Sequence, residues 1–317
     1  HQLIEELVKK EFSNPILNQL LDSASVEIDG CDFCFTTDSY VVKPLFFPGG
    51  DIGRLAVWGT VNDLTVSGAQ PLYLSASLII EEGLDREVLE KVLHSMGQAA
   101  REAGVLLVTG DIKVVERGSA DKLFISTSGI GKTKKPLSFK QIQAGDNLVV
   151  TGTLGEHSIA VLCAREGLGL SSEIKSDCAP LNALLLDLLN EFEGIRFMRD
   201  ITRGGLATIF NEVARSTGLG IRTDEERIPV QEEVHAVCEL LGLDPLYLAN
   251  EGKALLVVSR EDADRIVAVL RENPLGKESR IVGEVVKEPP SRVIMRTRVK
   301  GERFIDMLTG EQLPRIC

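Results

Sequence analysis

Apolar side chains in the first third of the chain recur at helical spacing behind a residue suited to cap a helix. Asp51 is the expected N-cap, and the apolar positions that follow return every three or four residues. The pattern predicts a helix that carries Asn62 and Asp63 and ends near Gly68. A shorter amphipathic pattern over residues 4–12 predicts an N-terminal helix.

Strands and a second helix are predicted around that first long helix. An apolar face over residues 88–103, closed by Gly104, predicts the helix. The run 105–109 is too uniformly apolar to alternate and predicts a central, buried strand. Other strand-like runs lie at residues 31–37, 72–80 and 122–128.

The composition changes at Lys132-Thr-Lys-Lys-Pro136, the best candidate for a linker. Beyond it we predict helices near residues 182–189, 205–216 and 232–241, and strands near residues 147–151, 254–258, 281–286 and 292–298. Both halves mix helices with antiparallel-looking strands, so we predict an α+β fold of two sandwich-like domains. The expected bounds are 1–135 and 136–299, followed by a mobile tail over 300–317.

Composition narrows the function classes. The chain has 317 residues with 44% apolar side chains, and its net charge of −12 argues against a duplex nucleic-acid binder and against an anionic membrane surface. A phosphate ligand stays compatible with that charge if a divalent cation assists. No apolar run is long enough to span a membrane. Six scattered cysteines fit a reducing cytoplasm, and Cys31 and Cys34 are expected on opposite faces of a strand as structural thiols. The charged N-terminal pattern does not resemble a signal peptide, and because the sequence begins at His1 we expect a leader before it.

Three aspartates share a placement that suits a metal site. Asp38 follows a strand, Asp63 lies on the first long helix, and Asp111 ends an apolar strand beside Gly110. If they converge they repel one another unless a cation neutralises them, and Mg²⁺ prefers such oxygen ligands. The alternative is three separate turn or capping aspartates, and sequence spacing leaves both interpretations open.

The second half adds candidates for an anion site and a base. The segment Arg199-Asp200-Ile-Thr202-Arg203-Gly204-Gly205 opens a helix and offers backbone N–H groups and cations to a phosphate. Glu251 precedes an apolar strand and suits a base with a shifted pKa. The simpler interpretations are a capped turn and a paired turn residue.

A cysteine is the last residue of the chain. Gly310 and Pro314 disfavour regular structure around it, and the final eight residues could reach roughly 25 Å when extended. A thiol on such an arm could visit an active site and also be presented to another protein. A frayed end with an incidental cysteine is the alternative.

Several motifs together resemble a known group of proteins. The run Asp51 to Pro71 resembles the N-terminal signature of the AIR-synthetase (PurM-like) ATP-binding superfamily. Within it the chain looks like the HypE family of hydrogenase maturation factors, on motifs over nearly its whole length. These motifs are Thr37-Asp-Ser-Tyr-Val41, Pro44-Leu-Phe-Phe-Pro-Gly-Gly50, Val108-Thr-Gly-Asp111, Lys113-Val-Val115, Arg199 to Gly205, Ala249-Asn-Glu-Gly-Lys253 and the terminal Pro-Arg-Ile-Cys317. In the family a Gly-rich leader precedes the first helix and is not among the residues given, and Ile112 stands where the family usually has Thr.

The resemblance implies a PurM-like two-domain fold and a reaction. A carbamoyltransferase, HypF, would load the thiol of Cys317, and an ATP-dependent dehydration would convert the S-carboxamide to an S-cyanate for iron on a HypC–HypD complex. It implies Mg²⁺ on Asp38, Asp63 and Asp111, chemical roles for Glu251 and Lys113, and a homodimer paired through its N-terminal domains. ATP contacts are expected from Asp38, Asn62, Asp63, Gly110, Asp111, Asp200, Thr202, Arg203, Gly204 and Gly205.

Two other function classes fit parts of the pattern. A sibling enzyme such as selenophosphate synthetase, thiamine-phosphate kinase or AIR synthetase would use the aspartates but not the terminal cysteine. A non-catalytic thiol carrier would use Cys317 but not the aspartates. Slow Mg²⁺-dependent ATP hydrolysis by the purified protein would count against the carrier.

Overall fold

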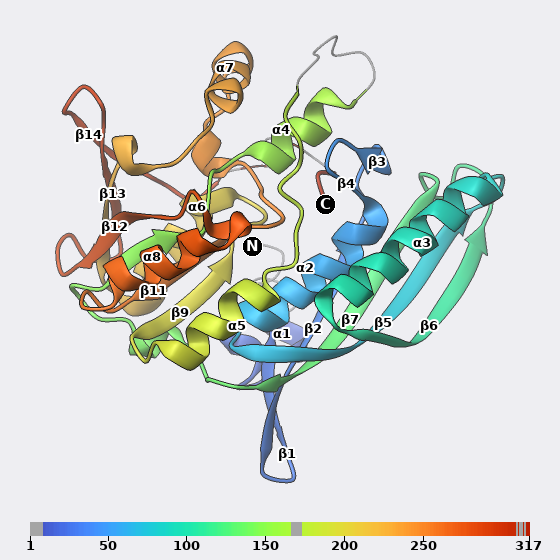
Figure 1. Cartoon of the computed structure of the whole chain (residues 1–317), viewed down its shortest axis with the longest axis horizontal. Helices are drawn as coiled ribbons and strands as arrows, with labels where there is room; N and C mark the ends of the chain where they lie inside the picture. Colours follow the sequence, from blue (N-terminus) through green and yellow to red (C-terminus); the bar gives the residue numbers. More distant parts are fainter. Residues whose placement is uncertain (1–8, 166–172, 309, 311–312, 314) are drawn as a thin grey trace.

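The computed structural model describes residues 9–165, 173–308, 310, 313 and 315–317 (Figure 1). Most of the predicted N-terminal helix lies outside these residues. The helices are α1 Lys9–Phe12, α2 Ile52–Val66, α3 Arg86–Ala103, α4 Glu156–Cys163, α5 Asn182–Glu191, α6 Gly205–Thr217, α7 Glu232–Leu241 and α8 Ala263–Glu272. The strands are β1 Ala24–Ile28, β2 Cys31–Tyr40, β3 Phe46–Phe47, β4 Gly50–Asp51, β5 Ala69–Glu81, β6 Leu106–Val115, β7 Leu123–Thr133, β8 Asn147–Val150, β9 Ile195–Asp200, β10 Gly220–Asp224, β11 Ala254–Val258, β12 Arg280–Val286, β13 Val293–Arg296 and β14 Glu302–Phe304.

The first sheet has the strand order β1-β2-β7-β5-β6. Only β5 and β6 are parallel, joined by the crossover helix α3, and the other pairs are antiparallel. The α2 and α3 helices cover one face of this sheet (Figure 1). Cys34 is buried and Cys31 is exposed, as alternation along β2 predicts.

The second sheet has seven strands in the order β14-β13-β10-β12-β8-β11-β9, and its strands β8 and β11 are buried on both faces, whereas β14 at the edge is exposed. Alternate residues of β8 and β11 point to opposite sides: Leu148 and Leu255 pack with α6, whereas Val149 and Leu256 pack with α5 and α8. The α+β prediction for both halves is therefore confirmed. Strand β14 pairs with β13 beyond residue 299, so the sheet continues past the end that we predicted for the second domain.

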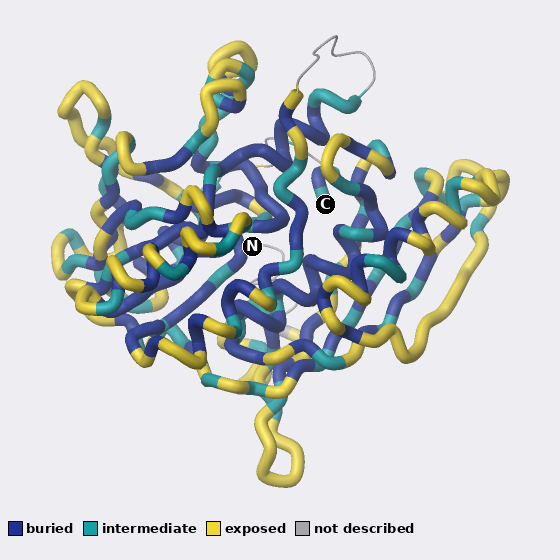
Figure 2. Tube along the Cα trace, viewed as in Figure 1, coloured by how far each residue is buried: buried dark blue, intermediate teal, exposed yellow. Residues whose placement is uncertain are grey.

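The α2 helix connects the two halves of the molecule. Asp51 caps it as predicted, because its Oδ1 accepts hydrogen bonds from the backbone N–H groups of Gly53 (2.8 Å) and Arg54 (3.1 Å). Nearly all of its residues are buried, since it packs on the first sheet and also on α5 and β9 of the second half (Figure 2). This position brings Asp63, near its C-terminal end, to the junction between the sheets.

The prediction of a central strand at residues 105–109 is wrong. Strand β6 is an edge strand, and its side chains are exposed along almost its whole length (Figure 2). Val108 is 58% exposed and Val114 is 67% exposed. An uninterrupted apolar run suits a strand covered on both faces, and in a single chain nothing among the described residues covers this one.

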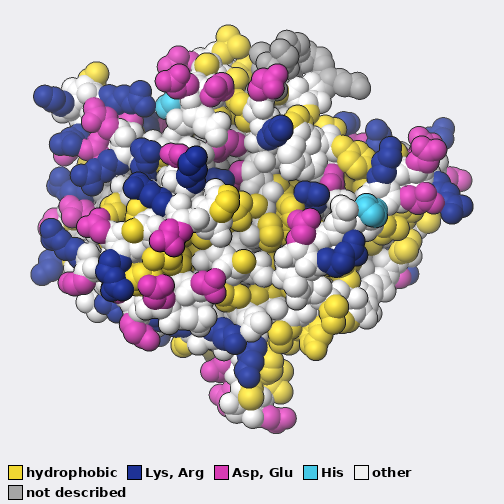
Figure 3. Space-filling model, in the orientation of Figure 1, with side chains coloured by type: hydrophobic (Ala, Val, Ile, Leu, Met, Phe, Trp, Pro, Cys, Tyr) yellow, Lys and Arg dark blue, Asp and Glu magenta, His cyan; other side chains and the backbone are white. Residues whose placement is uncertain are grey.

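No helix within the described ranges is both long and apolar enough to cross a membrane. Figure 3 shows acidic and basic side chains interspersed over the face in view.

Candidate active site

Three carboxylates converge at the junction of the two sheets, and we call them the acidic centre: Asp22, Asp63 and Asp200. Asp22 precedes β1, Asp63 lies on α2, and Asp200 ends β9. One oxygen from each lies within 4.8 Å of the others. The hydroxyl of Thr36 on β2 donates to Asp63 Oδ2 at 2.8 Å.

Burial and mutual repulsion disfavour the charged forms of these acids. Burial, followed by the neighbouring carboxylates, raises the pKa of Asp63 and of Asp200 well above the usual value. Burial raises the pKa of Asp22 to about 6, although Arg199 opposes the shift. Asp38 lies beside Asp63, and burial raises its pKa too, opposed by the hydrogen bond that Tyr40 Oη donates to Asp38 Oδ2 (3.1 Å).

One buried cation partly offsets this charge. Arg199 Nε lies 2.8 Å from Asp22 Oδ1, and its Nη1 lies 3.4 Å from Glu212 Oε2. A single guanidinium shared with Glu212 leaves the acidic centre with more carboxylates than cations. Hard oxygen donors in excess are the ligand set that a divalent cation such as Mg²⁺ prefers, so these residues fit that ion.

Glu251 lies close enough to this centre for Asp200 to influence its titration. Its side chain is 4% exposed, and its Oε1 has no hydrogen-bond partner among the described residues. Burial, then the charges of Asp200 and Asp177, raises the pKa of Glu251 well above its usual value. A buried carboxyl group with an unused oxygen is a strong candidate for a proton acceptor.

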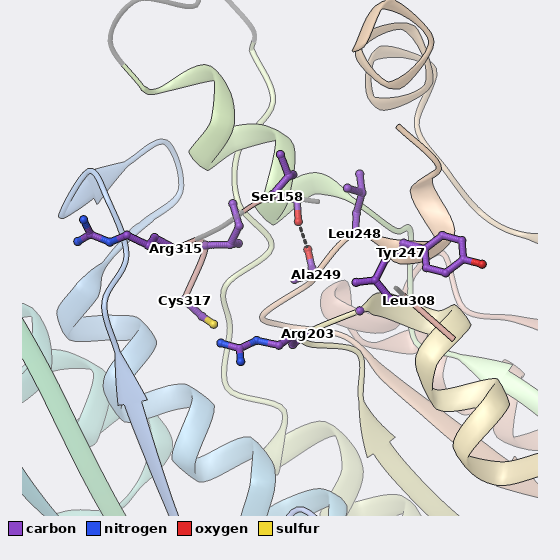
Figure 4. Close-up of a pocket in the computed structure, with 11 residues that line it drawn as sticks. Ser158, Arg203, Tyr247, Leu248, Ala249, Leu308, Arg315 and Cys317 are labelled. Carbon is purple, nitrogen blue, oxygen red and sulfur yellow. Dashed lines mark hydrogen bonds between the residues drawn. The ribbon is translucent and has the colours of Figure 1, made fainter. Parts of the chain in front are cut away.

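The last residue of the chain reaches the same region. Cys317 packs against the core cluster that contains α2, and its sulfur points toward the Arg203 guanidinium (Figure 4). Burial, then the charge of Glu251, raises the pKa of the Cys317 thiol to about 12, although a hydrogen bond with Arg203 opposes this shift. The thiol therefore lies between a cation and a buried carboxyl group.

The predicted anion segment is also at this place. Gly204 and Gly205 have positive φ angles of 78° and 60°, and α6 begins there without a side-chain cap. Arg203, Gly204 and Cys317 line one cavity. Thr202 contributes its backbone, since its carbonyl accepts a hydrogen bond from the Gly205 N–H at 2.9 Å.

Asn62 has a structural role that the sequence did not suggest. Its Nδ2 donates to the carbonyls of Ala179 (3.0 Å) and Glu251 (3.3 Å), and its Oδ1 accepts from the Leu181 N–H (2.8 Å). These bonds tie α2 to the second half of the chain and hold the backbone of Glu251. Both Nδ2 hydrogens are used in these bonds, whereas Oδ1 can accept one more, so a contact of Asn62 with a nucleotide stays a prediction.

The prediction that Asp111 converges with Asp38 and Asp63 is wrong for a single chain. Asp111 lies on the exposed strand β6, where its Oδ2 is 2.8 Å from Lys113 Nζ, and this ion pair lowers the pKa of Asp111. Gly110 lies on the same strand and packs against β5, where an added Cβ would come within 2.3 Å of the Ala76 carbonyl oxygen. Asp111, Lys113 and Gly110 are thus separated from the acidic centre within one chain.

Sequence reasoning missed Asp22 as a member of the acidic centre, and it assigned Asp200 to the nucleotide rather than to the metal. Asp22 precedes a strand, so the rule that selected Asp38, an aspartate after a strand, does not select it. It also missed Asp177, whose Oδ1 and Oδ2 accept the backbone N–H groups of Glu251 (3.1 Å) and Gly252 (3.2 Å). No local pattern marks Asp177.

Family models match both halves of the chain. The N-terminal domain of AIR synthase related proteins matches residues 21–133, and the C-terminal domain of the same group matches residues 143–296. Fold and site thus define a two-domain protein related to AIR synthase, as the sequence motifs predicted.

Individual relatives narrow the class. The carbamoyl dehydratase HypE of Cupriavidus necator is 49% identical over 319 residues, which cover 100% of this chain and 91% of that protein. The carbamoyl dehydratase HypE of Escherichia coli is 46% identical and is covered to 95% of its length. The chain therefore belongs to the HypE family of carbamoyl dehydratases.

Solved structures agree with this assignment. A chain in a crystal structure of a HypE–HypF complex superposes with a TM-score of 0.91 at 45% identity, covering 97% of this chain and 100% of that one. A HypE crystal structure in complex with ATP superposes with a TM-score of 0.87 at 46% identity, covering 100% of this chain and 96% of that one.

Proposed function

We propose that this chain dehydrates an S-carboxamide on its own Cys317 to an S-cyanate at the expense of ATP, and that the cyano group becomes an iron ligand in [NiFe]-hydrogenase maturation. The observation that carries the proposal is the position of the Cys317 sulfur, beside Arg203 and close to Glu251 and the acidic centre. A terminal thiol held at such a place needs a reason, and a reaction on the thiol itself is the simplest one.

The reaction balances without an outside oxidant or reductant. The carboxamide oxygen attacks the γ-phosphorus of ATP, and ADP leaves. The carbon–oxygen bond then breaks, phosphate departs with that oxygen, and the nitrogen gives up both protons as the nitrile forms. One proton can leave with the phosphate, and the other needs a base.

Glu251 is the proposed base. Its unused Oε1 and its raised pKa favour uptake of a proton from the carboxamide nitrogen. Asp177 and Asn62 position Glu251 through its backbone and do not use its carboxyl oxygens. Arg203 and the Gly204 amide are proposed to contact phosphate oxygens, where positive charge stabilises the transition state. The Gly205 N–H already donates to the Thr202 carbonyl, so it shapes the turn.

The acidic centre, with Asp38 beside it, is the proposed holder of Mg²⁺. A divalent cation bound there would neutralise negative charge on the phosphates. Asp111 stays a proposed ligand only through a second copy of the chain.

A homodimer is proposed through β6. This edge strand exposes Leu106, Val108 and Val114, and β5 beside it exposes Tyr73 and Ile79. Pairing of two copies there would cover this apolar surface. It would also move Asp111 and Lys113 from an exposed edge to a dimer junction, where Lys113 could stabilise charge on the reacting oxygen.

The proposed partners follow from the relatives. A HypE has been crystallised with HypF, and we propose that a HypF-type carbamoyltransferase loads Cys317 of this chain. A HypC–HypD complex is the proposed acceptor of the cyano group, and a cytoplasmic location is proposed because the thiol must stay reduced.

Intact mass tests the proposed function. The full chain is incubated with a HypF-type carbamoyltransferase, carbamoyl phosphate and ATP, and the modified peptide is then mapped. We expect a carboxamide on Cys317 that loses the mass of one water only when Mg²⁺ and ATP are both present. Adducts on Cys163, Cys178 or Cys238 would contradict the proposal, and a Cys317 adduct that never loses water would favour the thiol carrier.

A further inference from the structure

The end of the tail runs antiparallel to residues 41–43 and is held there by backbone hydrogen bonds. The Val41 N–H donates to the Cys317 carbonyl oxygen at 3.1 Å, and the Lys43 N–H donates to the Arg315 carbonyl oxygen at 3.4 Å. Arg315 Nε donates back to the Val41 carbonyl at 3.0 Å. This antiparallel register places the final residue opposite Val41 and so fixes how far the sulfur reaches.

A histidine on α4 makes a hydrogen bond with the backbone of the tail. His157 is fully buried, and its Nε2 lies 3.0 Å from the Ile316 carbonyl oxygen. A carbonyl can only accept, so Nε2 carries the proton, and Nδ1 accepts from the Ser176 hydroxyl at 2.8 Å. The Ser176 oxygen in turn accepts the Cys178 N–H at 3.1 Å, and Phe47 packs edge-on against the ring. The imidazole is therefore fixed in one orientation, aimed at the tail.

An arginine just after α4 also donates a hydrogen bond to the backbone of the tail. Arg165 Nη2 donates to the Arg315 carbonyl at 2.9 Å, and its Nε donates to the Lys43 carbonyl at 3.1 Å. Arg165 thus bridges the tail and the segment that the tail pairs with. It borders a cavity of about 640 Å³ that Lys43, Asp121 and Arg315 also line, so this bridge lies nearer solvent than His157.

We propose that His157 and Arg165 are positioning residues that form a latch, and that this latch holds the tail docked with the Cys317 sulfur at Arg203. Both contacts read backbone carbonyls, so the latch accepts the tail whatever its thiol carries. When the tail leaves, the buried Nε2–H of His157 loses its acceptor, which favours the docked state. Use of the latch in dehydration rests on the proposed function, but the docking itself does not.

Thiol protection measures the latch without any enzyme chemistry. The full chain is treated with iodoacetamide, without nucleotide, and the alkylation rate at each cysteine is followed by peptide mapping. Cys31 is exposed and serves as the reference for reagent reactivity, whereas Cys238 is buried in the second half and reports opening of the fold.

The variants are His157→Phe, which keeps a ring but removes the N–H, and Arg165→Gln. We expect each to raise the alkylation rate at Cys317 about tenfold relative to Cys238, as the loss of one buried hydrogen bond implies. His157→Gln, whose amide can donate in place of Nε2–H, should restore most of the protection. Arg86→Gln, which removes an exposed arginine on α3, is the matched control and should leave the rate unchanged.

The latch is contradicted if the ratio of the Cys317 rate to the Cys238 rate stays at the parent value in both variants. A parallel rise at Cys238 would leave that ratio unchanged and also counts against it. If the latch stands, carbamoylated His157→Phe should dehydrate about tenfold more slowly with an unchanged Kd for ATP. Failure of dehydration in the parent chain, with protection intact, would overturn the proposed function and not the latch.

Discussion

The acidic centre and the tail meet at one site but are held there by different forces. Asp63 and Asp200 lie on α2 and β9, elements whose apolar faces form the core, so these carboxylates cannot leave without unfolding. The tail is held by burial of Ile316, by the ion pair of Arg315 with Asp121 and by a few hydrogen bonds to its backbone. His157 and Arg165 donate two of those hydrogen bonds. A fixed acidic centre suits a ligand that the site binds and releases. A tail that can dock and undock suits a thiol that must also meet other proteins.

The largest expected effect comes from removing one carboxylate of the acidic centre. Asp63→Asn and Asp200→Asn should each weaken Mg²⁺–ATP binding by about 100-fold or more, because each removes a charged oxygen ligand. Calorimetry measures the binding, and iodoacetamide protection of Cys317 should stay at the parent level. Unchanged ATP affinity in both variants would contradict the metal site.

The next largest effect is on the rate of dehydration, with the binding of ATP and the docking of the tail left unchanged. Glu251→Gln keeps the shape of the side chain and removes its basicity, so dehydration should slow by about 10²–10³-fold with ATP binding retained. Single-turnover mass measurement on carbamoylated protein gives the rate. Turnover near the parent rate would exclude Glu251 as the base.

A third prediction concerns β6, which within one chain is separate from both the acidic centre and the tail. Ile112→Lys places a charge on the proposed dimer surface, where Ile112 is 56% exposed in the single chain. Sedimentation at micromolar concentration should change from dimer to monomer. Val299→Lys, at a residue 88% exposed in the second half, is the control and should stay dimeric. A parent chain that is already monomeric would remove the proposal.

Lys113 extends that prediction to the reaction. Lys113→Ala should slow dehydration of carbamoylated protein by about 10²-fold, through the loss of positive charge near the phosphorylated oxygen. In the Ile112→Lys monomer the same substitution should have little further effect, since Lys113 would act only across the dimer. Equal slowing in both backgrounds would contradict a role across the junction.

The smallest effect is on stability and its pH dependence. Because the pKa of Asp22 is raised to about 6 and burial raises those of Asp63 and Asp200 well above the usual value, the folded chain holds more protons than the unfolded chain above about pH 4. The metal-free protein should therefore lose stability as pH rises from about 4 to 7. Mg²⁺ and Asp63→Asn should each reduce this decline in Tm. A decline of equal size in the parent and in Asp63→Asn would contradict the burial of repelling charges.

Local patterns predicted most elements and the two-sheet division. Helix α2 was predictable because Asp51 and its apolar repeat agree, and β11 was predicted with its observed bounds. The position of strand β6 was predicted wrongly because an apolar run indicates that a strand is covered, but not whether the same chain or a second copy covers it. A dimer surface and a central strand give the same pattern in one sequence.

Site residues that the family resemblance names were predicted from the sequence. Site residues that only the folding of the chain brings together were not. Cys317, Arg203, Asp63 and Glu251 were found, and the structure brings them to one region. Asp22 and Asp177 were missed because their roles depend on residues far away in the chain: Asp22 meets Asp63 and Asp200, and Asp177 accepts the Glu251 N–H from 74 positions away. The latch residue His157 was missed for the same reason, since its partner Ile316 is 159 positions away.

The central claim is that a phosphoryl group held at the acidic centre is transferred to an oxygen carried by the tail. Cyanate adds to thiols and forms an S-carboxamide, so the full chain can be loaded with [¹⁸O]cyanate, with Cys317→Ala loaded in parallel. After addition of Mg²⁺ and ATP, mass spectrometry of the released phosphate follows the label. The account predicts one ¹⁸O in each phosphate formed with the S-cyanate, and none from Cys317→Ala. Label that appears in water, with unlabelled phosphate, would contradict it.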